Sequence, residues 1–318
     1  MFIVYRPSKE NVYICTSIKI ASSSTKFITG FEPVVNSTTA HHITLYGCKN
    51  PGSEEAIFNC GVMAYETILD QTYPSAADVC GSGFSVSQMI YVWSKGASEL
   101  LLPEDAAIPV SGPDTAIRWL VMQVHYKNVD TIPEKGDNAK IIVHYTDIPT
   151  PKTVGLLGTQ AFGIYPALTT THNEAVCQLS EDIVIHPFRY FVHTHDLGRV
   201  VSGWKVNSNM SWTLIGKRDP QSPNEFHSME NTEITMTKGD YLASRCTMVN
   251  TDDRLVNSGT TYLDEMCMFY ILYWVEGPKT LDMKVCMSKG YPFYSWSRGF
   301  VGKGPTLRNI PDEEASTL

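Results

Sequence analysis

Several features are absent from or scarce in this sequence of 318 residues. No stretch approaches the roughly 18–20 consecutive apolar residues of a membrane-spanning helix, so we expect no span. Lysine and arginine (25) are outnumbered by aspartate and glutamate (33) and form no basic run. The resulting net charge of −8 argues against nucleic acid as a partner. The first residues lack a cationic start and a long apolar run, so we do not expect them to act as a signal peptide.

The composition that is present is that of a folded protein. Hydrophobic residues make up 43% and charged residues only 18%, which excludes a disordered chain. Helical patterns are confined to residues 85–97 and 54–58. Elsewhere, short β-branched and aromatic runs such as Trp119–Tyr126 and Cys267–Glu276 are separated by turn residues. This pattern predicts an all-β fold of antiparallel sandwiches.

The length suggests two domains of roughly 150 residues each. Pro149 and Pro151 cannot both continue a central strand, so the segment around them is the best boundary. We therefore predict one domain at 1–147, a second at 152–303, and a tail at 304–318 that is a loosely held terminus.

The eight cysteines fall four in each half and form no CxxC pair, which weakens a structural-zinc interpretation. An even number in each domain is what intradomain disulfides require. Asn36 and Asn209 begin triplets that match the glycosylation acceptor pattern, although such triplets arise often by chance. We expect a disulfide-stapled glycoprotein of the secretory pathway, in secretory vesicles or secreted from the cell, with a natural start other than Met1.

The histidines gather in three groups: His41 with His42, His125 alone, and His193 with His195. On a strand, His193 and His195 would project from one face about 7 Å apart and could share a metal. Neighbours such as His41 and His42 point to opposite faces, so both could bind one metal only where a strand bends or ends. Taken alone, each histidine is more often a hydrogen-bonded structural residue.

Met266 lies in the apolar segment DEMCMFY. A buried methionine normally serves packing only. Beside imidazoles, however, a thioether would select Cu(I) over zinc, and the pair would indicate redox copper rather than a hydrolytic site. Composition alone does not establish that combination.

Ordered motifs then carry a resemblance to the peptidylglycine α-hydroxylating monooxygenases, a copper type II, ascorbate-dependent family. They are HHITLYGC, VMQVHY, HTHDLGRVVSGW, WTLIGKRDPQSP and DEMCMFYILYW. The resemblance covers the chain from about residue 13 to about residue 300. It implies two tandem antiparallel β-sandwich (jelly-roll-like) domains, disulfide-stapled, each holding one copper ion.

The resemblance also implies the ligands. The electron-supplying copper of the first domain would bind His41, His42 and His125. The catalytic copper of the second would bind His193, His195 and Met266. The implied disulfides are Cys15–Cys60, Cys48–Cys80, Cys177–Cys286 and Cys246–Cys267. Tyr13 and Gln123 are candidates for contacts behind the first set, and His186 lies near the second, whereas His144, His172 and His227 are interpreted as structural or surface residues.

The implied reaction is hydroxylation of the α-carbon of a C-terminal glycine in peptides, the first step of C-terminal amidation. It uses O2 as co-substrate and ascorbate as reductant. A separate lyase would release the amidated product, and we expect this chain to perform the first step only.

Two positions depart from the family. Phe191 stands where an arginine grips the substrate's terminal carboxylate, and Met268 stands where an asparagine is expected. Tyr270, the third member of that set, is retained, and Arg189 could replace the missing arginine if the strand is regular. The departures leave open a hydroxylase of a small amine, similar to dopamine β-monooxygenase. A non-catalytic copper-binding secreted paralogue is a further alternative, against which the six intact ligand positions argue. A zinc hydrolase would have no use for Met266.

Overall fold

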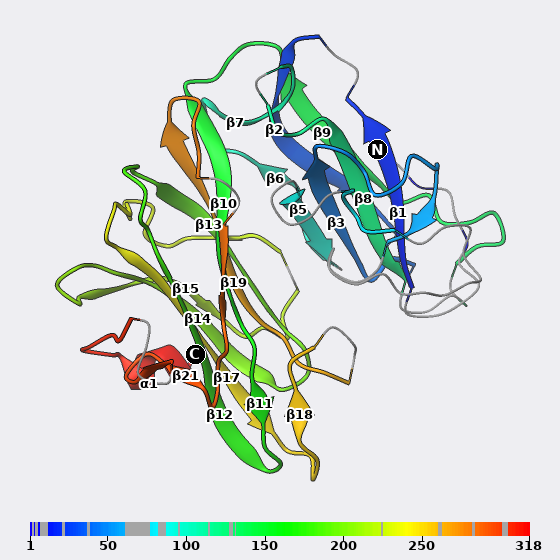
Figure 1. Cartoon of the computed structure of the whole chain (residues 1–318). Helices are drawn as coiled ribbons and strands as arrows, with labels where there is room; N and C mark the ends of the chain where they lie inside the picture. Colours follow the sequence, from blue (N-terminus) through cyan, green and yellow to red (C-terminus); the bar gives the residue numbers. More distant parts are fainter. Residues whose placement is uncertain are drawn as a thin grey trace. The chain divides into compact units, whose positions relative to one another are not determined.

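The computed structural model describes the chain except residues 2, 4, 5, 7–11, 21, 22, 37, 38, 61–76, 82–86, 95, 114, 127–129, 131, 224, 260–262, 282, 283 and 301–304. It divides into two compact units, Met1–Val154 and Gly155–Leu318 (Figure 1). The domain limits expected from the sequence, 1–147, 152–303 and a tail at 304–318, are not tested by this division and stay a prediction. Within the described residues, no helix is long and apolar enough to cross a membrane.

The described residues of the first unit form nine strands in two sheets. They are β1 (Val12–Lys19), β2 (Thr25–Val34), β3 (His42–Cys48), β4 (Phe58–Asn59), β5 (Ser87–Ser94), β6 (Leu100–Leu101), β7 (Ala106–Ser111), β8 (Trp119–Tyr126) and β9 (Lys140–Thr146). One sheet has the order β4-β1-β8-β3-β5. In the other, β2 pairs with β6, β7 and β9 in antiparallel register. β3 is buried along nearly its whole length because it lies between β8 and β5.

Both predicted helices of this unit are wrong. Residues 87–94 form β5, and the segment 54–58 consists of irregular chain and bends until β4 begins at Phe58. The physical reason is visible in Met89, Ile90, Tyr91, Val92 and Trp93, which are all buried. A short, continuous apolar run has no helical period of its own, and its aromatic and β-branched content favours a strand.

The second unit is a β-sandwich built from longer strands. They are β10 (Lys152–Ala161), which starts at the end of the first unit, β11 (Ile164–Tyr165), β12 (Thr169–Gln178), β13 (His186–Thr194), β14 (Gly198–Val206), β15 (Trp212–Arg218), β16 (His227–Ser228), β17 (Tyr241–Asn250), β18 (Val256–Asn257), β19 (Cys267–Glu276), β20 (Lys284–Ser288), β21 (Tyr294–Ser295) and β22 (Gly299–Phe300). One sheet runs β16-β13-β19-β10 and the other β12-β17-β14-β15. The predicted all-β class is confirmed, although β20 pairs with β10 in parallel.

The core of the second unit explains which face of β13 and β19 stays available. Tyr190, Val192, Phe269 and Ile271 alternate along the two strands and join the buried cluster between the sheets. Gly203 on the opposite sheet lies under Phe269, where an added Cβ would come within 1.9 Å of the ring. The residues between these core positions therefore project from the other face.

Four disulfides staple the units, and no described cysteine is free. They are Cys15–Cys60, Cys48–Cys80, Cys177–Cys286 and Cys246–Cys267, each a pair that the resemblance implied. By restricting the unfolded chain, each could contribute about 2–4 kcal/mol to stability.

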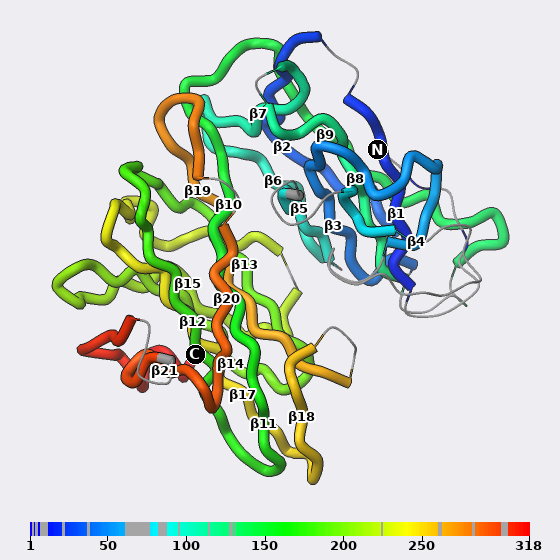
Figure 2. Tube along the Cα trace, viewed as in Figure 1, coloured from blue at the N-terminus to red at the C-terminus, as the bar shows by residue number. Residues whose placement is uncertain are grey.

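The C-terminal segment differs from the loose terminus that we expected. It ends in helix α1 (Asp312–Ser316), part of the red C-terminal trace in Figure 2. This helix contacts β14 and β17, and Ala315 is fully buried. Ser202 donates a hydrogen bond to the Ala315 carbonyl at 2.9 Å. Arg245, only 4% exposed, pairs with the Asp312 carboxylate at 2.6 Å. The polar sequence of the tail gave no sign of these contacts. The buried residue that anchors them, Arg245, lies on β17, far away in the sequence.

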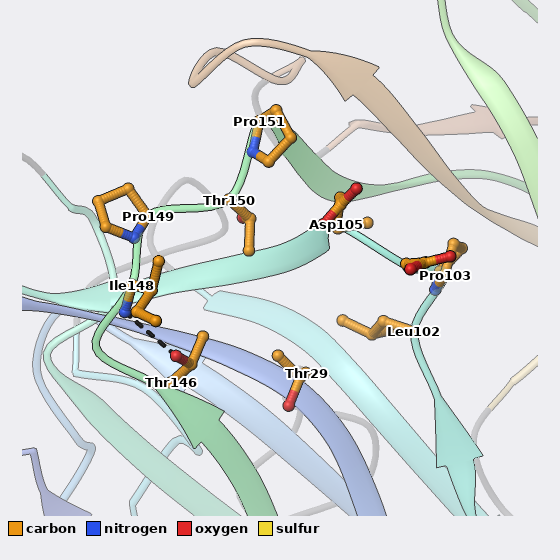
Figure 3. Close-up of a pocket in the computed structure, with 11 residues that line it drawn as sticks. Thr29, Leu102, Pro103, Asp105, Thr146, Ile148, Pro149, Thr150 and Pro151 are labelled. Atoms are coloured by element: carbon orange, nitrogen blue, oxygen red, sulfur yellow. Dashed lines mark hydrogen bonds between the residues drawn. The ribbon is translucent and has the colours of Figure 1, made fainter.

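A shallow pocket lies beside the predicted boundary segment (Figure 3). Ile148, Pro149 and Pro151 line one side and Leu102 and Asp105 another. None of the predicted site residues lines this pocket.

Candidate metal centres

The first candidate centre joins His41, His42 and His125. β3 begins at His42, so His41 precedes the strand and escapes the alternation of its side chains. His42 lies directly opposite His125 of β8. The His41 N–H also donates to the His125 carbonyl at 2.9 Å. Because β3 begins only at His42, the two neighbouring histidines are free of strand alternation and can face one ion.

The ring nitrogens of these histidines converge. His42 Nδ1 lies 3.3 Å from His41 Nδ1 and 3.4 Å from His125 Nδ1. One ligand nitrogen from each ring lies within 4.8 Å of the others. Two nitrogens bound to one ion at about 2.0–2.1 Å are at most about 4.2 Å apart, so the two shorter separations suit a single ion. Three imidazoles are a donor set that copper accepts.

Two residues surround this cluster. Tyr13 lies opposite His125 on β1, and their rings stack at 4.3 Å with 2° between the planes. Burial raises the pKa of Tyr13 to about 12, so its phenol stays neutral at pH 7. Gln123 is fully buried, and its amide donates to Cys60 Sγ at 3.7 Å, which ties it to the Cys15–Cys60 bridge. Its role behind the histidines stays a prediction.

The second candidate centre lies where β13 ends. His193 is the penultimate residue of the strand and His195 follows its last residue, with ring centroids 5.4 Å apart and planes at 79°. His195 Nδ1 lies 2.9 Å from the Asp264 carbonyl oxygen. Because a carbonyl can only accept, Nδ1 carries the proton and Nε2 keeps its lone pair for a metal. Met266 immediately precedes β19 and is 4% exposed.

A buried carboxylate links the segments that carry these residues. Glu265 is fully buried, and its Oε1 accepts hydrogen bonds from the backbone N–H groups of both His195 and Met266. Its Oε2 accepts from Leu197 N at 2.7 Å. Burial raises the pKa of Glu265, while these three donors act in the opposite direction. The carboxylate therefore fixes the turn after β13 against the start of β19.

The donor set of the second centre is also consistent with copper. Two imidazoles and a soft thioether favour Cu(I), whereas zinc sites are built from imidazole, thiolate and carboxylate. Gln221 supports the same turn by donating to the carbonyls of His195 at 2.7 Å and Gly198 at 3.1 Å. Glu265 and Gln221 thus hold the backbone of His195, and Glu265 also holds the backbone of Met266.

The face that β13 and β19 turn away from the core carries the predicted substrate contacts. From Arg189 to Thr194 the pairing with β19 is regular, so Arg189, Phe191 and His193 share one face. Phe191 lies opposite Tyr270, with ring centroids 6.0 Å apart, and His193 lies opposite Met268. The Tyr270 hydroxyl points along its strand and lies 3.4 Å from Met268 Sδ.

This face is apolar near His193 and cationic farther along β13. Phe191 is 4% exposed and packs on Phe226, with ring centroids 5.6 Å apart. Arg189 bonds Ser228 through its guanidinium, and burial lowers its pKa, an effect that Glu225 opposes. The regular register that Arg189 needed to replace the missing arginine is present.

The other histidines make different contacts. His186 stacks on Trp274 with ring centroids 3.8 Å apart. Burial, together with the charges of Arg218 and Arg189, lowers the pKa of His227 to about 4. The remaining contacts are His144 with Glu32 at 3.3 Å and His172 with Thr247 at 3.3 Å.

Sequence reasoning missed Glu265 and Gln221. Each lies in a quoted motif, but nothing in a single sequence distinguishes a buried carboxylate from a solvated one. The carbonyl of Asp264 could not have been found from side-chain chemistry at all.

Comparison with known proteins agrees with this geometry. Residues 2–133 match the N-terminal domain, and residues 152–299 the C-terminal domain, of copper type II ascorbate-dependent monooxygenases. The chain belongs to this family of oxidoreductases, whose name specifies copper as the metal and ascorbate as the reductant.

Particular relatives fall into two groups. Peptidyl-glycine alpha-amidating monooxygenase A of Xenopus laevis is 30% identical over 289 residues, which cover 90% of this chain and 29% of the relative. The peptidylglycine alpha-amidating monooxygenase of Rattus norvegicus is 30% identical over 290 residues, covering 90% and 28%. Dopamine beta-hydroxylase of the same species is 27% identical over 303 residues, covering 89% and 46%. The chain thus spans less than a third of the first two relatives.

Proposed function

We propose that the chain binds two copper ions and hydroxylates the α-carbon of C-terminal glycine in peptides, the first step of C-terminal amidation. His41, His42 and His125 would hold the ion that supplies an electron. His193, His195 and Met266 would hold the ion at which O2 reacts. The observation that carries the proposal is the second donor set, whose segments Glu265 fixes together in a chain of this family.

Bound copper would supply the chemistry that no side chain offers, one-electron transfer to O2 for insertion of oxygen into an unactivated C–H bond. The chain's own groups bind and orient. The Asp264 carbonyl keeps the proton of His195 on Nδ1. Glu265 holds the backbones of His195 and Met266 near each other, so less backbone ordering is needed when a metal binds.

The proposed substrate contacts are Arg189, Phe191, Met268 and Tyr270. Phe191 and Tyr270 would pack on the peptide and exclude water near His193. Arg189 lies two residues farther along the same face, about 7 Å away, and would attract the terminal carboxylate. The similarity to two amidating monooxygenases over 90% of this chain supports a peptide substrate.

One observation favours a second candidate, hydroxylation of a small aromatic amine. Phe191, Phe226 and Met268 make the face beside His193 apolar, and an aromatic ring would pack against it. Such a substrate has no carboxylate for Arg189 to bind.

The cellular setting follows from the disulfides. Four bridges fit an oxidising compartment, so we infer residence in the secretory pathway. Asn209 is exposed, as a glycosylation acceptor must be. A separate lyase would cleave the hydroxylated product.

The test is to incubate copper-loaded protein with ascorbate, O2 and a peptide ending in glycine, and to measure the product by mass spectrometry. We expect the peptide to gain one oxygen atom. Product from a phenethylamine but none from the peptide would replace the first candidate by the second. As a matched pair, His42→Ala should abolish turnover, whereas His144→Ala, which removes a half-exposed histidine paired with Glu32, should retain it.

A further inference from the structure

Gln160 carries a polar group that the fold does not use. It lies on β10 and is 6% exposed. Its carboxamide oxygen is buried, and no donor among the described residues reaches it. Burying an amide oxygen without a hydrogen bond destabilises a protein, so such groups are rare unless a ligand satisfies them.

Contacts between β10 and β19 show how the two neighbouring strands are aligned. An added Cβ on Gly155 would lie 2.5 Å from the Tyr273 hydroxyl oxygen, and one on Gly158 would lie 2.0 Å from the Tyr270 ring. Residue numbers rise along β10 as they fall along β19, so the strands are antiparallel. Gly158 is needed because any side chain there would displace the Tyr270 ring.

Extending this alignment by two residues places Gln160 opposite Met268. Thr159 points into the core, where its hydroxyl lies 2.6 Å from Ser244 Oγ. Because successive side chains alternate, Gln160 projects from the other face, which is the face of His193.

Three side chains therefore form one row across three neighbouring strands: His193 on β13, Met268 on β19 and Gln160 on β10. Adjacent strands are about 4.8 Å apart, so the backbones of the first and last residues are separated by about 10 Å. An extended substrate segment of about three residues spans that width. The next row contains Phe191, Tyr270 and Gly158, and there the surface is aromatic.

We propose that Gln160 recognises the peptide N–H of the C-terminal glycine whose α-carbon is hydroxylated, and that this N–H donates to the carboxamide oxygen of Gln160. A glycine whose nitrogen is methylated lacks that donor. This inference rests on the proposed function and adds the group of the substrate that Gln160 recognises.

The unsatisfied amide also predicts opposite effects on stability and binding. Gln160→Met keeps the length of the side chain and removes the buried polar group. In the free protein we expect the melting temperature to rise by about 2–4 °C, because an orphan acceptor is lost. A residue with a purely structural role would show the opposite sign.

The experiment measures binding and turnover with two substrates. Calorimetry uses copper-loaded protein without ascorbate, so that no turnover occurs, and titrates a glycine-extended peptide or the same peptide with an N-methylated terminal glycine. We expect Gln160→Met to weaken binding of the first peptide about tenfold, the loss expected for one hydrogen bond. It should leave binding of the N-methylated peptide unchanged within twofold. The ratio of kcat/KM values with ascorbate should follow the same pattern.

Controls separate the outcomes. Gln178→Met changes an exposed glutamine that bonds Tyr241 and should alter neither peptide. Gln160→Glu retains the shape and adds a charge that repels the substrate carboxylate, so it should weaken the natural peptide more than Gln160→Met does. Equal losses with both peptides, or no loss with either, would overturn the inference while the proposed function stands. A wild-type protein that neither binds nor hydroxylates the glycine-extended peptide would overturn both.

Discussion

The two candidate metal centres are built by different means. In the first unit, three histidines meet because β1, β8 and β3 pair in register and β3 begins at His42. Their ring nitrogens lie 3.3 and 3.4 Å apart. In the second unit, the histidines lie at the end of β13, and Glu265 fixes them relative to Met266.

The difference shows where each centre is vulnerable. A site held by strand register is stabilised by the sheet itself. To perturb such a site without unfolding the unit, one must change its ligands or the rings packed on them. A site held by one buried carboxylate depends on that group, because two backbone donors of the turn after β13 and one just before β19 bond to it. The two centres should therefore respond differently to the same kind of substitution.

The largest expected effect comes from Met266→Ile. Isoleucine fills similar volume but offers no sulfur donor, so turnover should be abolished and copper content should fall from two ions to one per chain. Copper analysis together with the peptide hydroxylation assay measures both. Met248→Ile, the same change in the core of β17, should cost about 1 kcal/mol of stability and keep both ions. Activity retained in Met266→Ile would contradict the ligand assignment.

The second prediction concerns Glu265→Gln. Its amide nitrogen would face a backbone N–H, and the remaining bonds would lose their charge, so the free energy of unfolding should fall by about 3 kcal/mol. At a temperature where the protein stays folded, copper should dissociate faster from the second centre and not from the first. Glu174→Gln is the control, since it weakens the pair with Arg245 and touches neither centre. Equal copper loss from both centres would show that Glu265 is not specific to one.

The third prediction is a pH dependence in the second unit. His227 has a pKa of about 4 in the fold against 6.5 for an unperturbed imidazole, so the unfolded chain binds the proton more readily. Stability is therefore complete above pH 6.5 and decreases as pH falls towards 4, by about 2 kcal/mol at pH 5. The melting temperature of the second unit should drop by about 4–8 °C between pH 7 and pH 5 beyond the change in His227→Gln. If the melting temperatures of the wild-type protein and of His227→Gln fell equally with pH, protonation of His227 would not be the cause.

The smallest expected effect is that of Tyr13→Ala at the first centre. Removing the ring that stacks on His125 should weaken copper binding there about tenfold and leave the second centre unchanged. Tyr13→Phe keeps the stacked ring and serves as the control. If Phe and Ala variants lose copper equally, the hydroxyl rather than the stacking is responsible.

The sequence allowed much of this comparison to be predicted, because strand runs such as Trp119–Tyr126 carry their own signal and each candidate ligand motif contains its histidines. It could not show that His41 lies outside β3, since the strand's start depends on pairing with β8. The helix expected at 85–97 was wrong for the same reason, as partners rather than local pattern decide how a short apolar run folds.

The burial of individual polar side chains was the other property that could not be predicted from the sequence. Glu265 and Gln160 are polar letters in a sequence, and only the sheets around them show that one is fully hydrogen-bonded and the other retains a buried oxygen that lacks a donor among the described residues.

The docked C-terminal segment has a practical consequence for anyone who shortens the chain. The family match ends at residue 299, yet the Arg245 guanidinium of the second sandwich donates to Asp312, which follows it. A protein trimmed to the matched residues would expose the Arg245–Glu174 pair and the Trp296 indole to water and lose the Asp312 partner. Expression boundaries should therefore lie beyond Ser316.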